Sequence, residues 1–200
     1  MTTPTEMRTK TIIRNCELRG TACNEENGDM ILEGYAAVFD SPTVLYEIDG
    51  VQYKETLERN AFQNTEMKDC CMKYNHDDSA LLLARTRGGS LNVSIDDVGL
   101  KFRAKLFNTT FARDIYTLVK EGGLDKCSFA FTIKDDSYDK KSRTRTIKQI
   151  KELYDVSVVD IPAYDDTSVV ARSYFELVRE KEHALVREKL AKQLLVRTYL

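Results

Sequence analysis

Apolar and polar residues alternate along most of the chain, and this alternation predicts a protein built mainly of β-strands. The clearest case is residues 91–106, where Leu, Val, Ile, Phe and Ala alternate with Asn, Ser, Lys and Arg around a turn at 96–99. A period of two residues is typical of a hairpin that buries one face and exposes the other. The other strands that this pattern predicts cover residues 11–18, 30–39, 51–55, 71–74, 146–150 and 153–159.

Turn-forming and charged residues separate these runs. Residues 21–29, which contain an Asn-Gly pair, are expected to form the turn between the first two strands. Pro and Gly residues indicate a loop over residues 40–50, and a bulge is expected near Lys151. The charged segment 135–145 is expected to be an exposed hairpin loop.

Helical spacing occurs in a few segments. Residues 56–63 can form a helical turn that faces Leu57, Ala61 and Phe62 inward. Capping residues at 108–110 predict a helix over residues 111–121, which Gly122-Gly123 ends. The inward stripe of that helix is expected to consist of Phe111, Ile115, Leu118 and Val119.

The tail, residues 173–200, differs from the rest of the chain. Ser173 and Glu176 form a capping box, and an apolar stripe follows among Lys, Arg and Glu residues. This pattern predicts a long amphipathic helix that either packs on the domain or is offered to a partner. His183 lies among charged residues of this helix and is expected to face solvent.

The candidate chemistry begins in residues 124–133. Cys127, Phe129 and Phe131 alternate there with Ser128 and Ala130, which gives a strand with a large apolar face and a small-residue face. Ser128 lies on the small face, where large neighbours do not cover a hydroxyl. Cys127 lies on the opposite, apolar face, and buried apolar cysteines are usually inert, so it is the lesser candidate nucleophile.

An imidazole and a carboxylate can complete a reactive group around Ser128. One of the two histidines, His76, stands at the end of a predicted strand, where it is either a surface residue of an acidic turn or a general base. Asp155 lies within an apolar run and is costly to bury without a partner, which makes it a better candidate than Glu152 or Asp160. A hydroxyl, an imidazole and a carboxylate are the parts of a nucleophilic hydrolase if the fold brings them together.

Composition narrows the class of protein. Two hundred residues with 42% hydrophobic and 31% charged residues fit one soluble globular domain. A net charge of −2 gives no electrostatic reason to expect nucleic acid as a partner. Apolar runs are too short to span a membrane, and residues 1–10 lack the pattern of a secretory signal, so we expect a flexible N-terminus and a cytoplasmic protein.

The five cysteines are expected to be reduced thiols. A zinc site of Cys70, Cys71 and His76 is conceivable, but adjacent cysteines rarely both bind one structural metal. We therefore expect neither a metal nor a cofactor.

Five motifs in order resemble the prohead (capsid maturation) protease family of tailed bacteriophages, over residues 11–172. They are Gly34-Tyr-Ala-Ala-Val-Phe, the Asn75-His-Asp turn, the Gly89-Ser-Leu and Asp97-Val-Gly-Leu hairpin, Ser128-Phe-Ala-Phe, and Tyr154-Asp-Val-Ser with Ile161-Pro-Ala-Tyr. The resemblance implies an α+β fold, a small and mostly antiparallel β-barrel surrounded by helices, as in the herpesvirus assemblin proteases. Residues 11–172 would be the protease domain, and residues 173–200 the appended C-terminal helix.

The same resemblance implies a serine endopeptidase without a cofactor that works inside the procapsid in the host cytoplasm. Its substrates and partners would be the phage scaffold and the major capsid protein, whose scaffold-like extension it would cut, together with itself. The comparison with the herpesvirus proteases also implies a homodimer, whereas charge and composition give no reason to expect a nucleic acid or membrane partner. The alternative is a non-catalytic capsid-assembly or scaffold-binding β-domain, in which Ser128 and His76 would lie far apart.

The resemblance also implies roles for individual residues. Ser128 matches the family nucleophile and His76 its base. Asp155 matches the acidic third position, where many members carry glutamate and the herpesvirus relatives a second histidine. For the oxyanion we expect backbone N–H groups near Ala163 and Tyr164, with Arg85 as the alternative.

Overall fold

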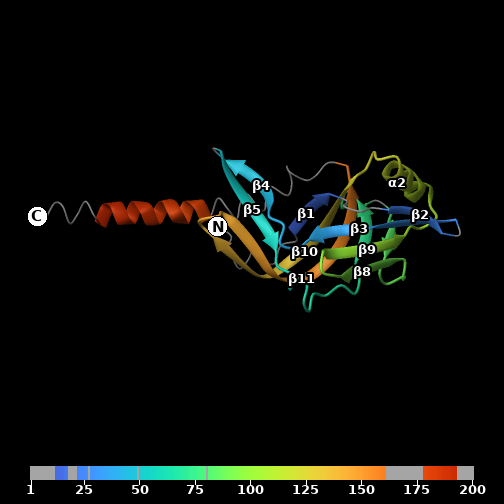
Figure 1. The fold of residues 1–200 in the computed structure, drawn as a ribbon, viewed down its shortest axis with the longest axis horizontal. Helices are drawn as coiled ribbons and strands as arrows, with labels where there is room; N and C mark the ends of the chain where they lie inside the picture. Colours follow the sequence, from blue (N-terminus) through green and yellow to red (C-terminus); the bar gives the residue numbers. More distant parts are fainter. Residues whose placement is uncertain are drawn as a thin grey trace, which may run out of the picture.

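The computed structural model of the chain is α+β, with most of its described residues in strands (Figure 1). It describes residues 12–17, 22–26, 28–48, 50–79, 81–160 and 178–192. The strands are β1 (Ile12–Glu17), β2 (Ala22–Glu26), β3 (Asp29–Val38), β4 (Thr43–Ile48), β5 (Val51–Leu57), β6 (Cys71–Tyr74), β7 (Ala84–Arg85), β8 (Leu91–Ile95), β9 (Gly99–Lys105), β10 (Lys126–Asp139) and β11 (Thr144–Val159). The helices of this part are α2 (Thr110–Lys120) and a C-terminal helix at residues 178–192.

The larger sheet is organised around β11. Its order is β1-β10-β11-β5-β4, and β6 joins β11 on the side away from β10 and carries β7. β10 runs antiparallel to β11 along nearly its whole length, whereas β5 and β6 run parallel to its first and last parts. Tyr154 and Lys151 are extra residues in the β11 ladder, which confirms the bulge predicted near Lys151.

The smaller sheet has the order β2-β3-β9-β8, and its β8–β9 hairpin is the one that alternation predicts most clearly. Gly99 begins β9 where that strand meets the bulge in β3. A Cβ there would lie 1.9 Å from the carbonyl oxygen of Ala37, so only glycine fits.

One apolar core joins the two sheets and α2. Leu32 and Phe102 enter it from the smaller sheet, and Phe129, Phe131 and Leu153 enter it from the larger one. The rings of Phe129 and Phe131 stack with centroids 4.8 Å apart. The side of β10 that carries Cys127 and the phenylalanines is thus fixed in the core, which leaves Ser128 on the other face.

Helix α2 begins where the capping residues predict, because the Thr109 hydroxyl accepts a hydrogen bond from the backbone N–H of Ala112 at 3.1 Å. The predicted set of inward-facing residues is partly wrong. The buried residues are Ala112, Ile115, Tyr116 and Val119. Leu118 is exposed, because the contact stripe is turned by about one residue relative to the predicted one.

The N-terminal part differs from the sequence prediction in its pairing. The predicted turn over residues 21–29 contains β2, which forms a hairpin with β3, and β1 pairs instead with β10. The predicted loop over residues 40–50 contains β4, which pairs with β5. β2 contains mostly polar residues, so its alternation is hard to recognise before the pairing partner is known. β4 is mostly apolar, but it lies between the turn-forming residues Pro42 and Gly50, which favour a loop.

Two further segments are more extended than predicted. β5 continues to Leu57 and is followed by turns rather than a helical turn, although Leu57, Ala61 and Phe62 are buried as expected. The predicted loop 135–145 is mostly strand, because β10 runs to Asp139 and β11 starts at Thr144. Partners explain the second difference: Arg145 is buried against Asp136, at 3.0 Å, and Glu55, at 3.6 Å.

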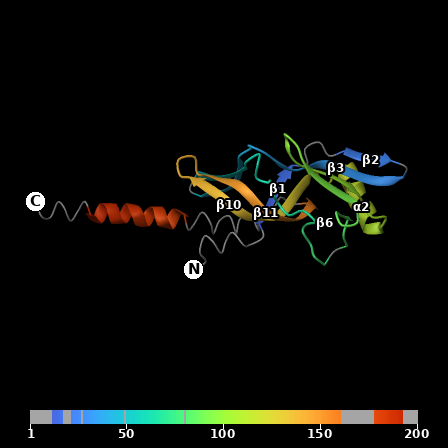
Figure 2. The same ribbon diagram turned by 90° about the horizontal axis from the view of Figure 1, so that it is seen from below.

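The predicted barrel is not established by the strand pairing, because neither sheet closes on itself within the described residues. Residues 1–10, with the predicted flexible N-terminus, lie outside the described residues, as does the expected helix start at Ser173. The helix at 178–192 extends away from the sheets in both views (Figures 1 and 2), and Lys140 contacts it through Glu182 at 3.8 Å.

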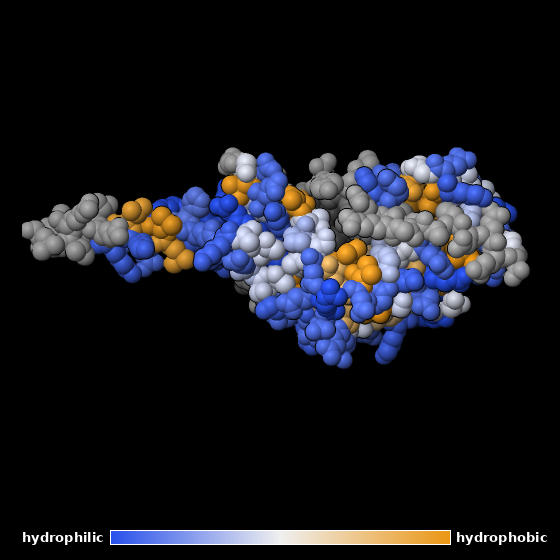
Figure 3. Space-filling view, viewed as in Figure 1, coloured by the Kyte–Doolittle hydropathy of each residue, from blue (hydrophilic) through white to orange (hydrophobic). Residues whose placement is uncertain are grey.

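The apolar stripe of that C-terminal helix is largely in solvent. Leu185 and Val186 are 57% exposed and Leu190 is 53% exposed, and apolar surface is visible along this helix (Figure 3). His183 is exposed, as expected. Of the two alternatives for this helix, the exposure of its described residues fits a helix offered to a partner better than one packed on its own domain. Neither described helix is long and apolar enough to cross a membrane.

Candidate active site

Strand register brings Ser128 and Asp155 to one face of the larger sheet. Across the antiparallel β10–β11 pair, Ser128 lies opposite Ser157, and Ala130 lies opposite Asp155. Residues opposite one another in a ladder point to the same face, so the hydroxyl of Ser128 and the carboxylate of Asp155 are diagonal neighbours. On the other side of β11, the parallel strand β6 runs alongside Asp155 and ends just before His76.

A turn with unusual backbone angles returns His76 over this face. Asn75 and His76 have φ values of 52° and 56°, in the left-handed region that costs a non-glycine residue roughly 1–2 kcal/mol. Hydrogen bonds to the end of β11 hold the turn in place. The N–H of Asn75 donates to the Val158 carbonyl at 2.9 Å, and its side-chain oxygen accepts from the N–H of Asp160 at 3.2 Å. Strain held in this way is typical of functional positions.

The three candidate side chains form one chain of hydrogen bonds. His76 Nδ1 lies 2.6 Å from Asp155 Oδ1, and His76 Nε2 lies 2.7 Å from Ser128 Oγ. A carboxylate can only accept, so Nδ1 carries the proton and Nε2 is free to accept from the serine hydroxyl. This is the tautomer that a general base acting on Ser128 requires.

The site lies mostly inside the protein. Ser128 has no exposed surface, and the side chains of Asp155 and His76 are 5% and 12% exposed. Hydrogen bonds between buried groups are electrostatically stronger than the same bonds in water. Ser128 is thus more buried than expected from the small-residue face of its strand.

Of the competing carboxylates, only Asp155 contacts His76 among the described residues. Asp160 accepts a hydrogen bond from the Tyr74 hydroxyl at 3.0 Å, and the backbone of Glu152 forms a bridge with Glu66. Cys127 is buried in the core with its Sγ 3.6 Å from the backbone carbonyl of Ser128, on the face away from His76.

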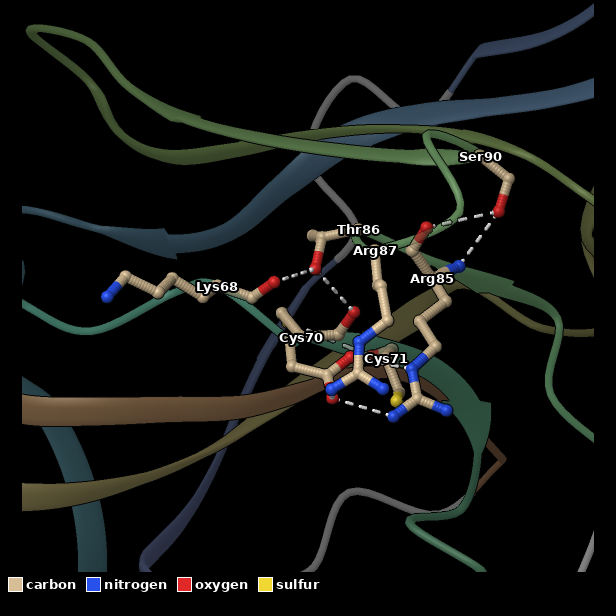
Figure 4. A network of polar contacts seen from close by, with 8 residues as sticks. Lys68, Cys70, Cys71, Arg85, Thr86, Arg87 and Ser90 are labelled. Atoms are coloured by element: carbon tan, nitrogen blue, oxygen red, sulfur yellow. Dashed lines mark hydrogen bonds and ion pairs between the residues drawn. The ribbon is translucent and has the colours of Figure 1, made fainter.

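Of the predicted oxyanion residues, the structure describes only Arg85, which forms a salt bridge with Asp69. Ala163 and Tyr164 lie outside the described residues. Arg85 is paired in a fork with Asp69, with N–O distances of 2.6 and 2.8 Å. Figure 4 shows Arg85 and Arg87 side by side next to Cys71, and Arg87 reaches Asp69 at 2.6 Å. Hydrogen bonding from Arg85, with the charges of both guanidinium groups, holds the pKa of Asp69 below its usual value.

Cys70 and Cys71, the two cysteines of the conceivable zinc site, are free thiols in the structure. Burial raises the pKa of Cys70 to about 12, and it also raises the pKa of the half-buried Cys71, so both stay thiols at neutral pH. Within the described part of the chain, no group of three His, Cys, Asp or Glu residues is placed to bind a metal ion. His76, the third ligand of the conceivable zinc site, is instead bonded to Asp155 and Ser128.

Two further groups at this site, Ser157 and Lys73, are not predicted from the sequence. Ser157 donates a hydrogen bond to Asp155 Oδ1 at 2.9 Å, and Lys73 Nζ lies 3.8 Å from Asp155 Oδ2. The spacing of Asp155 and Ser157 is a usable signal, because residues two apart on a strand share a face. Lys73 could not be found in this way, since its position depends on the parallel pairing of β6 with β11.

Comparison with known proteins decides the family. The sequence profile of the caudovirus prohead serine proteases matches residues 17–181. The chain belongs to this family. This prohead protease is therefore a serine peptidase, as the resemblance implies. No curated protein matches the chain closely enough to count as a relative.

A solved structure shows that the fold is shared with a phage enzyme. The prohead protease resembles the bacteriophage T4 capsid assembly protease, gp21, with a TM-score of 0.51 and 12% sequence identity. The match covers 76% of this chain and 98% of gp21. At this identity the likeness speaks for the fold alone.

Proposed function

We propose that this prohead protease is a maturation endopeptidase that cuts the scaffold, or the scaffold-like extension of the capsid protein, and itself. In this proposal Ser128 is the nucleophile, His76 the general base and Asp155 the residue that orients His76. The observation that carries it is the unbroken hydrogen-bond chain from Asp155 through His76 to Ser128, in a member of a serine protease family.

The proposed reaction follows from the direction of these hydrogen bonds. Ser128 Oγ attacks the scissile carbonyl carbon while its proton passes to His76 Nε2. The imidazolium then protonates the leaving amine, and a water molecule repeats the sequence to release the acyl group from Ser128. Asp155 keeps the Nδ1 proton in place and stabilises the positive charge that forms on His76.

The proposed oxyanion donors are backbone N–H groups near Ala163 and Tyr164, which follow β11 in the sequence. Arg85 remains the alternative, because it lies on the same face of the sheet as Asp155. Cys71 on β6 is in register with both of them, with Arg85 on β7 and with Asp155 on β11. To reach a substrate, its guanidinium would have to leave Asp69. The backbone groups need no such exchange and are the preferred assignment.

The setting and partners are part of the same proposal. The capsid assembly function named for gp21, together with the family match, supports an enzyme that acts in the procapsid in the host cytoplasm. Its partners would be the phage scaffold and the major capsid protein, and it would act as a homodimer. We further propose that its two sheets form the incomplete equivalent of the herpesvirus-type barrel.

The alternatives meet specific obstacles. A cysteine nucleophile at Cys127 would have to leave the core and cross to the other face of β10. The non-catalytic alternative requires Ser128 to lie far from His76, whereas the distance is 2.7 Å.

The test uses the purified protein and a fusion of the phage scaffold with the capsid protein. Wild type should cut the fusion, Ser128→Ala should not, and Cys127→Ala should retain cleavage. A fluorophosphonate should label wild type and not Ser128→Ala, and iodoacetamide should not stop turnover. Cleavage by folded Ser128→Ala, with an unchanged thermal unfolding curve, would refute the assignment.

A further inference from the structure

The Asp155 carboxylate has contacts beyond the one to His76. Its Oδ1 atom accepts from both His76 and Ser157, and its Oδ2 atom faces the Lys73 ammonium at 3.8 Å. Lys73 also pairs with Asp78, whose side chain is 90% exposed. The lysine therefore lies between a buried carboxylate and one at the surface.

Strand register explains why these groups meet. Ser157 lies opposite Ser128 on β10 and in register with Lys73 on β6, so the three side chains share one face across three strands. Asp155 occupies the next position on that face. Ser157 has no exposed surface, and the Lys73 side chain is 16% exposed. Ser157 and Lys73 thus contact the Asp155 carboxylate from neighbouring positions on the same face of the sheet.

A buried carboxylate needs more than a neutral imidazole beside it. Burying a charge is costly unless it is paired and hydrogen-bonded, and His76 is neutral when it is ready to act as a base. The charge of Asp155 must then be offset by another group in the resting enzyme. We propose that Lys73 and Ser157 are positioning residues, which keep Asp155 ionised and aim its Oδ1 atom at His76. This inference rests on the proposed function and deepens it.

The other titratable groups near Asp155 do not supply this charge. Cys71 on β6 and Cys70 just before it are neutral thiols at neutral pH, because burial raises the pKa of each. Arg85 on β7 lies on the same face, but its guanidinium is paired with Asp69. The turn after β6 contributes His76 and the exposed Asp78, and β10 presents Ser128 and Ala130, which are uncharged.

Lys73 keeps its own charge across the neutral range. Burial by itself would lower the pKa of Lys73, but the hydrogen bond to Asp78 and the negative charges of Asp155 and Asp78 outweigh burial and raise it. Among the described residues, Lys73 is the cation whose salt bridge reaches the second oxygen of Asp155.

The charge of Lys73 also acts on His76, because both contact the same carboxylate. A nearby cation disfavours the imidazolium, so removing it should raise the pKa of His76. A change in packing alone would not move this titration in a fixed direction.

The chain allows a direct test, since it has only two histidines. Histidine labelled with ¹³C in the ring gives two NMR signals to titrate, and His183→Gln assigns them. The titration is made in a Ser128→Ala background, so that self-cleavage cannot interfere and no activity is needed. Lys73→Met should raise the pKa of His76, Lys73→Arg should leave it near its original value, and Lys148→Met should not change it.

Lys148 is the matched control because it is an exposed lysine on the same strand as Asp155. For Ser157, the variant Ser157→Ala should lower kcat several-fold without changing KM and should shift the His76 Nδ1 proton resonance. Ser157→Thr keeps the hydroxyl and should restore part of both. Thermal unfolding shows that each variant is folded before it is compared.

The outcomes separate this inference from the proposed function. If Ser128→Ala abolishes cleavage but Lys73→Met leaves the His76 titration unchanged, the role of Lys73 is refuted and the proposed function stands. If Ser128→Ala still cleaves, the proposed function fails whatever the titration shows. Unchanged kcat in folded Ser157→Ala would refute the role of Ser157.

Discussion

Replacing Asp155 by asparagine tests the orientation of the catalytic imidazole, because it changes one atom and keeps the shape. The Lys73 ammonium near Oδ2 favours the carbonyl oxygen of the new amide on its own side. The amide NH₂ group then faces His76 Nδ1 and donates to it. The imidazole must move its proton to Nε2, where it can no longer accept the proton of Ser128.

The expected loss is large and falls on kcat. Holding the wrong tautomer costs about 10⁴-fold in kcat in a Ser-His-Asp peptidase, or about 5 kcal/mol in the activation free energy. The 2.6 Å contact to Asp155 is short and its carboxylate is 5% exposed, so solvent cannot replace the lost interaction. Cleavage of the scaffold–capsid fusion by Asp155→Asn is followed by gel densitometry, beside thermal unfolding.

Two neighbouring carboxylates provide matched controls. Asp160→Asn and Glu152→Gln remove the same charge from nearby positions on or just after β11, and neither carboxylate contacts His76. Both variants should stay within a few-fold of wild type. If Asp155→Asn retained a tenth or more of the wild-type rate, or if Asp160→Asn lost as much as Asp155→Asn, the assignment of Asp155 would be wrong.

Three other predictions concern the surroundings of the site. Arg85 holds the pKa of Asp69 below the ordinary value of 3.8. Wild type should therefore be more stable than Asp69→Asn above about pH 4, and this difference in stability should vanish as the pH falls through the folded-state pKa of Asp69. Thermal unfolding between pH 2 and 6 measures this, and a difference that persists at pH 2 would contradict it. Glycine adopts the left-handed backbone of position 75 without strain, whereas alanine there incurs about 1 kcal/mol of strain. Asn75→Gly should therefore keep more activity than Asn75→Ala, and equal kcat values would argue against the role of this turn. Gly99→Ala places a Cβ 1.9 Å from a backbone oxygen and should destabilise the fold by several kcal/mol in urea unfolding, whereas the open turn position Gly88 should accept alanine with little loss.

Local chemistry predicts the elements in which a single strong pattern dominates. The β8–β9 hairpin has regular alternation, and Thr109 is placed to cap α2, so both follow from the sequence. The strand β2 is mostly polar, and β4 is flanked by turn-forming residues, so neither is recognised locally. Their pairing with β3 and β5 supplies the hydrogen bonds that make them strands. Tertiary pairing overrides local preference in these segments.

The candidate site residues can be predicted more completely than the sheet that holds them, because few residues in this chain can act as a catalytic base. The chain has two histidines, and one of them lies in a charged helix, so the sequence indicates His76 as the candidate base. The small-residue face of β10 indicates Ser128 as the nucleophile. Their contact depends on features that no local pattern contains. These are the parallel pairing of β6 with β11 and the left-handed turn that carries His76 back over the sheet.

The environment of Asp155 shows why a correct set of residues is not yet a description of the site. Its position in an apolar run indicated that it needed a partner, and His76 meets that need for a hydrogen bond but not for charge. The compensating positive charge comes from Lys73, which precedes Asp155 by 82 residues (155 − 73). It belongs to a strand that the sequence predicts as short and mostly apolar. A burial argument can therefore state that a cation must be near, but only the register of β6 against β11 identifies which one.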